Sequence, residues 1–176
     1  GATLVGIGGI GGSIEPGEAI LACLRREVEE EIKASIRVES ATTTHLIYEK
    51  GVTEPLSLPQ REYPLPVLLT ISRNLHRQDL HPDYGILAIA TFLAQLEGEP
   101  RIDDLYGLLI VPRDKLVDIM RPNEIALDCL DQMPGIRRIT QEPLPKNTVL
   151  GPVWTGRSLQ LLLQAGRLYD IKGVPR

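Results

Sequence analysis

The most regular pattern of hydrophobic and polar positions lies between residues 18 and 34, where the spacing is that of an amphipathic helix. The hydrophobic residues fall on one side of a helical wheel, namely Ile20, Leu21, Leu24, Val28 and Ile32. Helical periodicity begins at about Glu18, directly after Pro16 and Gly17, and an acidic residue suits the positive end of a helix. We therefore predict a helix here, entered from a glycine-rich loop.

Hydrophobic and β-branched segments on both sides of this helix predict strands. The apolar, glycine-rich residues 1–12 favour a short strand that enters the loop. After the helix, strands are predicted over residues 35–48, 67–72, 86–96 and 105–111. The Ala and Leu content of residues 86–96 also suits a helix. Residues 49–65 are expected to form a long loop or lid, and residues 74–84 a polar connection.

The C-terminal part of the chain carries helical patterns that are separated by prolines. A short helix is predicted over residues 113–120, a second over 122–133 and a final amphipathic helix over 158–168. A loop is expected between the last two helices, because this segment contains Pro134, Pro143, Pro145 and Pro152.

The composition limits the classes of protein to consider. With 176 residues, of which 43% are hydrophobic, the chain is expected to form one domain with a sizeable core. The formal net charge is −4 and no basic run is present, so we expect no nucleic-acid groove. No hydrophobic stretch approaches membrane-spanning length and no signal peptide opens the chain, so we expect a cytoplasmic protein without a membrane partner. Cys23 and Cys129 match no metal-ligand spacing and are expected to be reduced, packed thiols.

Three glutamates on the predicted helix form a single acidic patch beside its hydrophobic side. Glu27, Glu30 and Glu31 are related by i, i+3 and i+4 spacing, whereas Glu29 points towards solvent. Carboxylates held this close repel one another unless protons or a cation neutralise them. Hard divalent cations such as Mg²⁺ and Mn²⁺ prefer oxygen ligands. The pattern therefore predicts a metal site on the helix, next to a loop whose glycines let the backbone approach a ligand closely.

The loop and helix resemble the signature box of the Nudix hydrolases, G-x5-E-x7-R-E-U-x-E-E-x-G-U, in which U is a bulky aliphatic residue. The positions in register with this box are Gly12, Glu18, Arg26, Glu27, Val28, Glu30 and Glu31. Two positions differ, because Lys33 stands in place of the glycine and Ala34 is small for the final aliphatic residue. A lysine near the C-terminal end of a helix is electrostatically tolerable, so we do not expect Lys33 to disable the site.

The resemblance implies an α/β fold, namely a Nudix-type α/β/α sandwich with a mixed β-sheet between helices. We expect residues 1–176 to form a single Nudix-like domain, with a core over 1–120 and a C-terminal helical extension over 121–176. Nudix domains usually carry further strands before the box, so we expect this core to lack its N-terminal strand or strands. The extension is expected either to cap the substrate pocket or to form a homodimer surface, and the sequence does not decide between these roles.

The activity that the resemblance implies is metal-dependent hydrolysis of the pyrophosphate bond in a nucleoside diphosphate linked to another group. The implied cofactor is Mg²⁺ or Mn²⁺. Glu27 and Glu31 are the expected metal ligands, and Glu30 is expected to be a third ligand or the base that activates water. The backbone carbonyl of Gly12, or that of Gly11, is expected to complete the coordination.

Arg26 is counted with the catalytic residues because it precedes Glu27 within the box. A guanidinium fork holds carboxylates well, so we expect Arg26 to orient Glu27 or to pair with Glu18 rather than to contact substrate. The alternative is an ordinary surface salt bridge.

Many Nudix hydrolases recruit another acid from a loop before the closing strand. In this chain the acids nearest to that position are Asp103 and Asp104, and Glu124 is a further candidate. His76 and His81 in the polar connection are candidates for contact with a phosphate or for acid–base catalysis. The alternative for all five residues is an ordinary exposed loop side chain.

Two other functions are compatible with the sequence. A non-catalytic Nudix-fold module that binds a nucleotide is favoured by the uncertain late acid and disfavoured by the intact Glu27, Glu30 and Glu31. A plain interaction domain with an acidic helix predicts no preferential binding of Mg²⁺ or Mn²⁺. The box does not identify the group linked to the diphosphate, and we expect residues 49–65 and 74–84 to select it.

Overall fold

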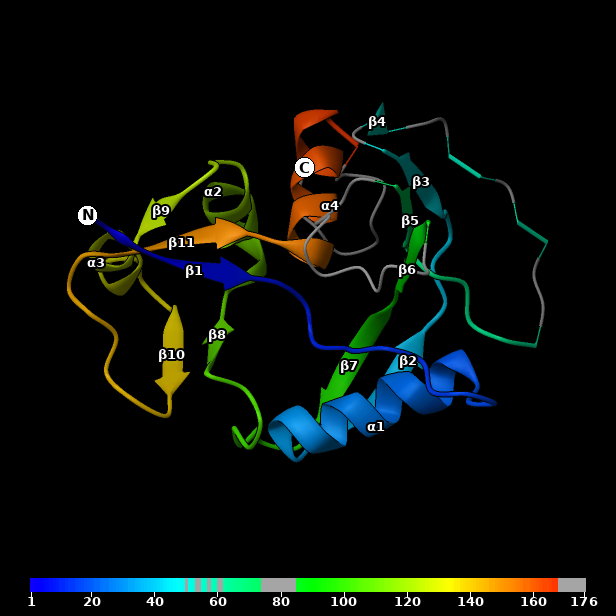
Figure 1. Cartoon of the computed structure of the whole chain (residues 1–176), viewed down its shortest axis with the longest axis horizontal. Helices are drawn as coiled ribbons and strands as arrows, with labels where there is room; N and C mark the ends of the chain where they lie inside the picture. Colours follow the sequence, from blue (N-terminus) through cyan, green and yellow to red (C-terminus); the bar gives the residue numbers. More distant parts are fainter. Residues whose placement is uncertain (50, 53–54, 57, 60–61, 74–84, 168–176) are drawn as a thin grey trace.

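The computed structural model describes residues 1–49, 51–52, 55–56, 58–59, 62–73 and 85–167 (Figure 1). The strands are β1 (Thr3–Ile7), β2 (Ser35–Glu39), β3 (His45–Tyr48), β4 (Gly51–Val52), β5 (Leu68–Ser72), β6 (Leu87–Thr91), β7 (Leu93–Glu97), β8 (Gly107–Ile110), β9 (Ile125–Ala126), β10 (Arg137–Thr140) and β11 (Thr148–Pro152). The helices are α1 (Ile20–Ile32), α2 (Leu116–Met120), which follows the 3₁₀ turn η1 (Arg113–Lys115), α3 (Leu127–Asp131) and α4 (Trp154–Gln164). The predicted α/β class is confirmed.

The strands pair in both directions, which makes the sheets mixed. Within the described residues the strand orders are β1–β11–β9, β10–β8, β2–β7 and β4–β3–β5–β6. β1 lies parallel to β11, with Thr3 opposite Thr148, and β3 lies parallel to β5. The other pairs are antiparallel. The pairing of β1 with β11 brings the first and last described strands together.

The hydrophobic core has two parts. The larger part surrounds α2, α4, β5 and β11 and includes the fully buried Leu162. The smaller part fixes α1, because Val28 and Ile32 pack against Leu105, which precedes β8, and Leu108, which lies in β8. Burying a side chain of this size contributes about 1.5–3 kcal/mol. The packed side of α1 therefore sets which of its other residues remain available at the surface.

The predicted helix is confirmed, with differences at its start and along its hydrophobic side. α1 begins at Ile20 rather than at Glu18, because a turn occupies the preceding residues. Ile20 is 41% exposed although the wheel placed it on the hydrophobic side. Cys23 is buried there instead, which the wheel did not indicate. The first turn of α1 therefore contributes less to the core than the sequence suggests.

Two of the predicted strands are interrupted. Residues 35–48 form β2 and β3, and residues 86–96 form most of β6 and β7, with Phe92 between them. β6 pairs with β5 whereas β7 pairs with β2, so one hydrophobic segment takes part in two sheets. The helical alternative for residues 86–96 is excluded. The strands predicted at 67–72 and 105–111 are confirmed as β5 and β8.

The C-terminal part differs most from the prediction. The proline-containing segment contains β10 and β11 rather than a loop alone, and the helix predicted over 122–133 is limited to α3 and preceded by β9. α4 begins at Trp154, before the predicted start. The 121–176 extension, expected to consist of helices and a loop, therefore also contains the strands β9, β10 and β11. Prolines favour loops, but pairing with the distant β1 holds β11, and Pro152 stands at its last position.

Two further expectations concern membranes and cysteines. Among the described residues, no helix is both long enough and apolar enough to cross a bilayer. Both cysteines are free thiols, but only Cys23 is buried, whereas Cys129 is exposed. The expectation of a packed thiol therefore holds for Cys23 alone.

Candidate active site

The residues before α1 form a turn that closes on itself. Gly17 has φ of 81°, a backbone conformation that glycine adopts without strain. The Glu18 N–H donates to the Glu15 carbonyl at 2.9 Å, and the Glu15 N–H donates to Glu18 Oε2 at 3.0 Å. The side chain of Glu18 is thereby turned back towards the loop and faces the helix that follows.

Arg26 links three of the box carboxylates. Its Nε and Nη2 donate to the two oxygens of Glu18 at 2.9 and 3.0 Å, which is a bidentate arrangement. Its Nη1 donates to Glu27 Oε1 at 2.8 Å and to Glu30 Oε2 at 3.0 Å. The bond from Arg26, followed by the backbone bond of Glu15, lowers the pKa of Glu18 from its ordinary 4.5 to about 2. Both contacts that the sequence anticipated for Arg26 are thus present.

Gly12 leaves the space that the Glu27 carboxylate occupies. A Cβ at residue 12 would overlap Oε1, Oε2 and Cδ of Glu27, so a side chain there requires the carboxylate to move. The Glu27 side chain is only 14% exposed and is held from the other side by Arg26. The glycine at this position therefore has a steric reason, and its backbone lies directly beside a carboxylate.

Glu31 lies at the centre of a group of negative charges. Its Oε2 accepts a bond from the Gly11 N–H at 3.3 Å. Burial raises the pKa of Glu31, the Gly11 bond opposes this, and the nearby charges of Glu27, Asp104 and Glu30 raise it further. Helix α1 and the turn before β8 therefore bring carboxylates from two distant segments close together, and the loop before α1 adds a backbone N–H.

The turn before β8 lies against the C-terminal end of α1 (Figure 1). The Lys33 Nζ is 2.7 Å from Asp103 Oδ2, and both residues line a polar cavity of about 380 Å³ together with Glu30 and Asp104. Asp103 and Asp104, which the sequence selected as the nearest late acids, therefore do lie next to the glutamates of the box.

Of the remaining candidates, Glu124 does not line this cavity. Glu124 precedes β9, which lies on the opposite side of the molecule from α1 (Figure 1). His76 and His81 lie outside the described residues. Of the predicted acids, Asp103 and Asp104 are thus the ones that lie beside the box.

The chemistry of the cluster suits a hard divalent cation, since its donors are carboxylate oxygens beside the backbone of Gly11 and Gly12. Gly12 supports this fit, because its missing Cβ leaves room against Glu27. Among the described residues, however, no three His, Cys, Asp or Glu side chains form a complete ligand set. Glu30 is bonded to Arg26 rather than turned towards Glu31. A complete set of metal ligands therefore requires that a further carboxylate side chain rotates towards Glu27 and Glu31.

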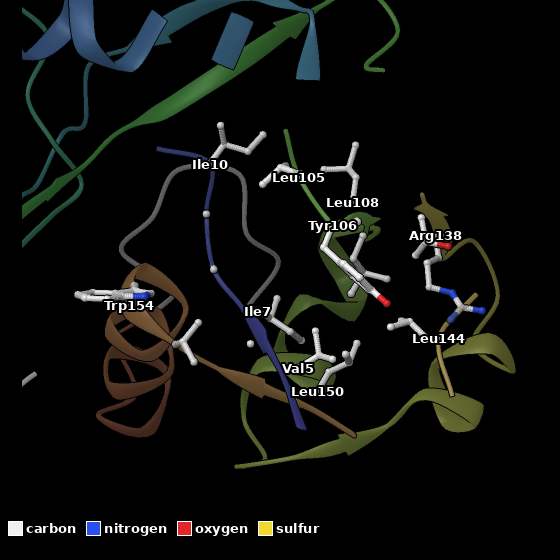
Figure 2. A pocket seen from close by; sticks show the side chains of 17 residues that line it. Val5, Ile7, Ile10, Leu105, Tyr106, Leu108, Arg138, Leu144, Leu150 and Trp154 are labelled. Atoms are coloured by element: carbon white, nitrogen blue, oxygen red, sulfur yellow. The ribbon is translucent and has the colours of Figure 1, made fainter. Parts of the chain in front are cut away.

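A second, largely apolar cavity of about 340 Å³ lies between β1 and β8 (Figure 2). Tyr106, Arg138 and Leu144 lie at one end of this apolar cavity and Trp154 at the other. It adjoins the glycine loop through Ile10, and its other lining residues are Val5, Gly6, Ile7, Gly8, Gly9, Leu105, Gly107, Leu108, Leu109, Thr140, Leu150 and Val153. The apolar cavity therefore borders the glycine loop and the end of the turn that carries Asp103 and Asp104.

Two contacts at the site were not predicted. Lys33 was expected only to be tolerated, whereas it pairs with Asp103. Thr155 was not singled out, yet its Oγ1 accepts a bond from the Gly9 N–H at 2.5 Å. The opposite charges of Lys33 and Asp103 were the only sequence signal for the first contact, and no local spacing connects them. The second contact depends on the position of α4 and has no signal in the sequence.

Comparison with known proteins identifies the family. The family model described as NUDIX domain matches residues 4–130, which is more than half of the chain. No curated protein and no solved structure matches the chain. The matched range includes the glycine loop, α1 and the turn that carries Asp103 and Asp104. The chain belongs to the NUDIX domain family.

Proposed function

We propose that this chain is a metal-dependent hydrolase that cleaves the pyrophosphate bond of a nucleoside diphosphate linked to another group. Membership of the NUDIX family supports hydrolysis of nucleoside diphosphate-linked substrates in general. The observation that carries the more specific proposal is the cluster in which Glu27, Asp104 and Glu30 surround the half-buried Glu31. Such a concentration of negative charge calls for a cation.

Glu27, Glu31 and Asp104 are the residues that we assign to holding Mg²⁺ or Mn²⁺, together with the backbone carbonyl of Gly12. When bound, the cation would offset the charge of the phosphates and lower the pKa of attacking water. Glu30 is 53% exposed, and its Oε2 is held by Arg26. We assign its other oxygen, Oε1, the role of accepting the proton of the attacking water.

Arg26 has a positioning role in this proposal. It keeps Glu27 against Gly12 and keeps Glu30 at the rim of the site, while Glu18 fixes the guanidinium by a two-point contact. Since its hydrogen bonds with the described residues go to carboxylates, the Ser13 carbonyl and Cys23, it has little capacity left to bind a phosphate.

The apolar cavity between β1 and β8 is our choice for the group linked to the diphosphate. It borders the glycine loop at Ile10 and the acidic turn at Leu105, so a substrate can extend from the carboxylate cluster into it. Its apolar lining and the ring of Tyr106 favour an aromatic or apolar group. Tyr106→Ala is expected to raise KM for such a substrate more than it lowers kcat.

The experiment that tests the function is the release of phosphate or nucleoside monophosphate across a substrate panel with Mg²⁺ or Mn²⁺. The panel contains nucleoside triphosphates, nucleotide sugars, ADP-ribose and dinucleoside polyphosphates. Turnover that stops when a chelator removes the metal and returns when the metal is restored supports the proposal and identifies the substrate class. Turnover that continues without metal contradicts it.

The second candidate is a Nudix-fold module that binds a nucleotide without hydrolysing it. It is favoured by one observation, namely that Arg26 already pairs with Glu18, Glu27 and Glu30 and so neutralises part of the box. A nucleotide that raises the melting temperature with metal present, without any turnover across the panel, would favour this module over the hydrolase.

A further inference from the structure

Lys33 occupies a backbone conformation that normally selects glycine. It follows the last residue of α1 with φ of 48° and ψ of 45°, and its N–H donates to the Glu29 carbonyl at 3.1 Å. Side chains with a Cβ are strained in this left-handed region, which is why helices commonly end in glycine there. A lysine at this position therefore needs a compensating contact, and the ion pair with Asp103 at 2.7 Å supplies one.

The turn of residues 101–104 is fastened to the end of α1 by its backbone as well. The Arg101 N–H donates to the Ile32 carbonyl at 2.8 Å, and the Asp103 N–H donates to the Glu31 carbonyl at 2.9 Å. These bonds satisfy two of the carbonyls that a helix end leaves without partners. The Asp103 carbonyl accepts a further bond from Gln141 Nε2 at 2.7 Å. Asp103 is therefore held through its N–H, its carbonyl and its side chain.

The two consecutive aspartates differ in what they contact. Asp103 is paired with Lys33, whereas Asp104 makes no hydrogen bond or ion pair with the residues that the structure describes. Both aspartates line the polar cavity with Glu30, and the negative charge of Asp104 helps to raise the pKa of Glu31. Asp104 is thus the aspartate whose oxygens remain available beside the box.

We propose that Lys33 and Asp103 form a clip that holds the 101–104 turn against α1 and so presents Asp104 to the cation site. Lys33 is then a positioning residue that acts through Asp103. The inference rests on the proposed function, because it assumes a cation at Glu27 and Glu31. By its charge alone, a nearby lysine repels a cation, so its removal should tighten cation binding. The proposal predicts the opposite, namely that removal of Lys33 weakens cation binding.

Titration of the metal-free protein with Mn²⁺, followed by calorimetry and by the spin resonance of free Mn²⁺, separates these possibilities. Lys33→Gly suits the left-handed backbone and preserves folding, and we expect it to weaken Mn²⁺ binding about tenfold, as for other groups that support a metal ligand. Lys33→Arg keeps the charge and should stay within about twofold. Equal or tighter binding by Lys33→Gly would overturn the proposal, since the lysine would then act only as a repelling charge.

Partner variants test whether the two residues act as one unit. Asp103→Asn should weaken Mn²⁺ binding about as much as Lys33→Gly, and the double variant should be no weaker than either one, because the clip is already lost. Asp104→Asn should weaken binding more than either. Lys115→Ala, which removes a lysine beside Asp114 and outside the cluster, is the matched control and should leave binding unchanged. Additive losses for Lys33 and Asp103 would contradict a shared role.

Amide hydrogen exchange tests the clip without any metal. In Lys33→Gly and in Asp103→Asn, the Arg101 and Asp103 amides should exchange about tenfold faster, while the Val28 amide within α1 keeps its rate. Unchanged exchange at the turn would overturn the clip even if Mn²⁺ binds. If the unaltered protein binds no Mn²⁺, the proposed function fails, while the exchange rates still show whether Lys33 and Asp103 hold the turn.

Discussion

Arg26 illustrates how one side chain determines the arrangement of several others. Its contacts with Glu18, Glu27 and Glu30 allow three carboxylates to lie close together at the surface of α1. Among the residues that the structure describes, Glu31 has no such partner, and burial together with its acidic neighbours raises its pKa. Three carboxylates of the box are thus paired with Arg26, whereas Glu31 is not. We expect Glu31 to respond differently from the other three to pH and to substitution.

The pKa of Glu18 depends on its bond from Arg26. Because the bond from Arg26 lowers that pKa from 4.5 to about 2, the stabilisation from Glu18 is present above about pH 4.5 and is lost as the pH falls through about 2. In Arg26→Gln the titration midpoint of the Glu18 carboxyl carbon, followed by NMR, should rise towards 4.5. Arg25→Gln, at an exposed position of α1, is the control. An unchanged titration midpoint of Glu18 in Arg26→Gln would show that Arg26 does not lower this pKa.

Replacing Glu31 should increase stability and abolish function. Since the folded pKa of Glu31 is raised, its charged form destabilises the metal-free protein at neutral pH, and this effect disappears at low pH, where the group is protonated. Glu31→Gln should therefore raise the melting temperature without metal by about 1–3 °C, as for a partly exposed charge interaction. Glu29→Gln serves as control. A lower melting temperature for Glu31→Gln at pH 7 would contradict the repulsion.

At the scale of elements, the glycine loop and α1 have to be considered together. The loop reaches α1 at Gly11 and Gly12, where the backbone lies against Glu31 and Glu27. In the proposed function neither element holds the cation alone, because the loop supplies backbone groups and the helix supplies carboxylates. A change that moves one against the other should therefore affect function more than stability.

Gly12→Ala tests this relation. The added Cβ overlaps the Glu27 carboxylate, which is the mobile end of its side chain, so the free energy of unfolding should fall by only about 1 kcal/mol. Turnover should fall about 10- to 100-fold, because Glu27 is displaced from its position. Ser13→Ala, next in the loop, is the matched control, because only the backbone carbonyl of Ser13 takes part in the bonds to Arg26 and Cys23. Full activity of Gly12→Ala would contradict a role for Glu27 at this position.

The elements also show how far the sequence alone can lead. The box and α1 were predictable because helical periodicity and motif spacing are local properties. The break at Phe92 was not, because it depends on β6 pairing with β5 and β7 with β2. β11 was missed because prolines surround it and its partner β1 is distant in sequence. The nearness of Asp103 and Asp104 to the box was anticipated, whereas the contact with Lys33 depends on the turn of residues 101–104.

At the scale of the whole molecule, the end of the described chain supports its beginning. β1 pairs with β11, the Val153 N–H donates to the Ile7 carbonyl at 2.9 Å, and the Gly9 N–H donates to Thr155 Oγ1 at 2.5 Å. The start of the glycine loop is therefore anchored to the first turn of α4. The segment after the box therefore helps to position the loop whose backbone lies beside the carboxylate cluster.

Gly156→Ala should be severely destabilising for this reason. A Cβ at residue 156 overlaps the Ile7 carbonyl and lies 3.2 Å from Met120 Cε, so α4 has to move away from β1. We expect the free energy of unfolding, measured by urea denaturation, to fall by about 2–4 kcal/mol. Gly85→Ala, where a Cβ meets no atom within 4 Å, is the matched control. A change below about 0.5 kcal/mol would show that this packing is not required.

The proposed function requires that carboxylates at the end of α1 hold the cation used for pyrophosphate hydrolysis. The most direct test compares turnover by the unaltered protein, Glu31→Gln and Glu29→Gln with saturating substrate and Mg²⁺ or Mn²⁺. The account predicts that Glu31→Gln loses at least about 100-fold, the upper range for groups that merely support a metal ligand, and that Glu29→Gln remains active. Equal turnover by Glu31→Gln and the unaltered protein would contradict the claim.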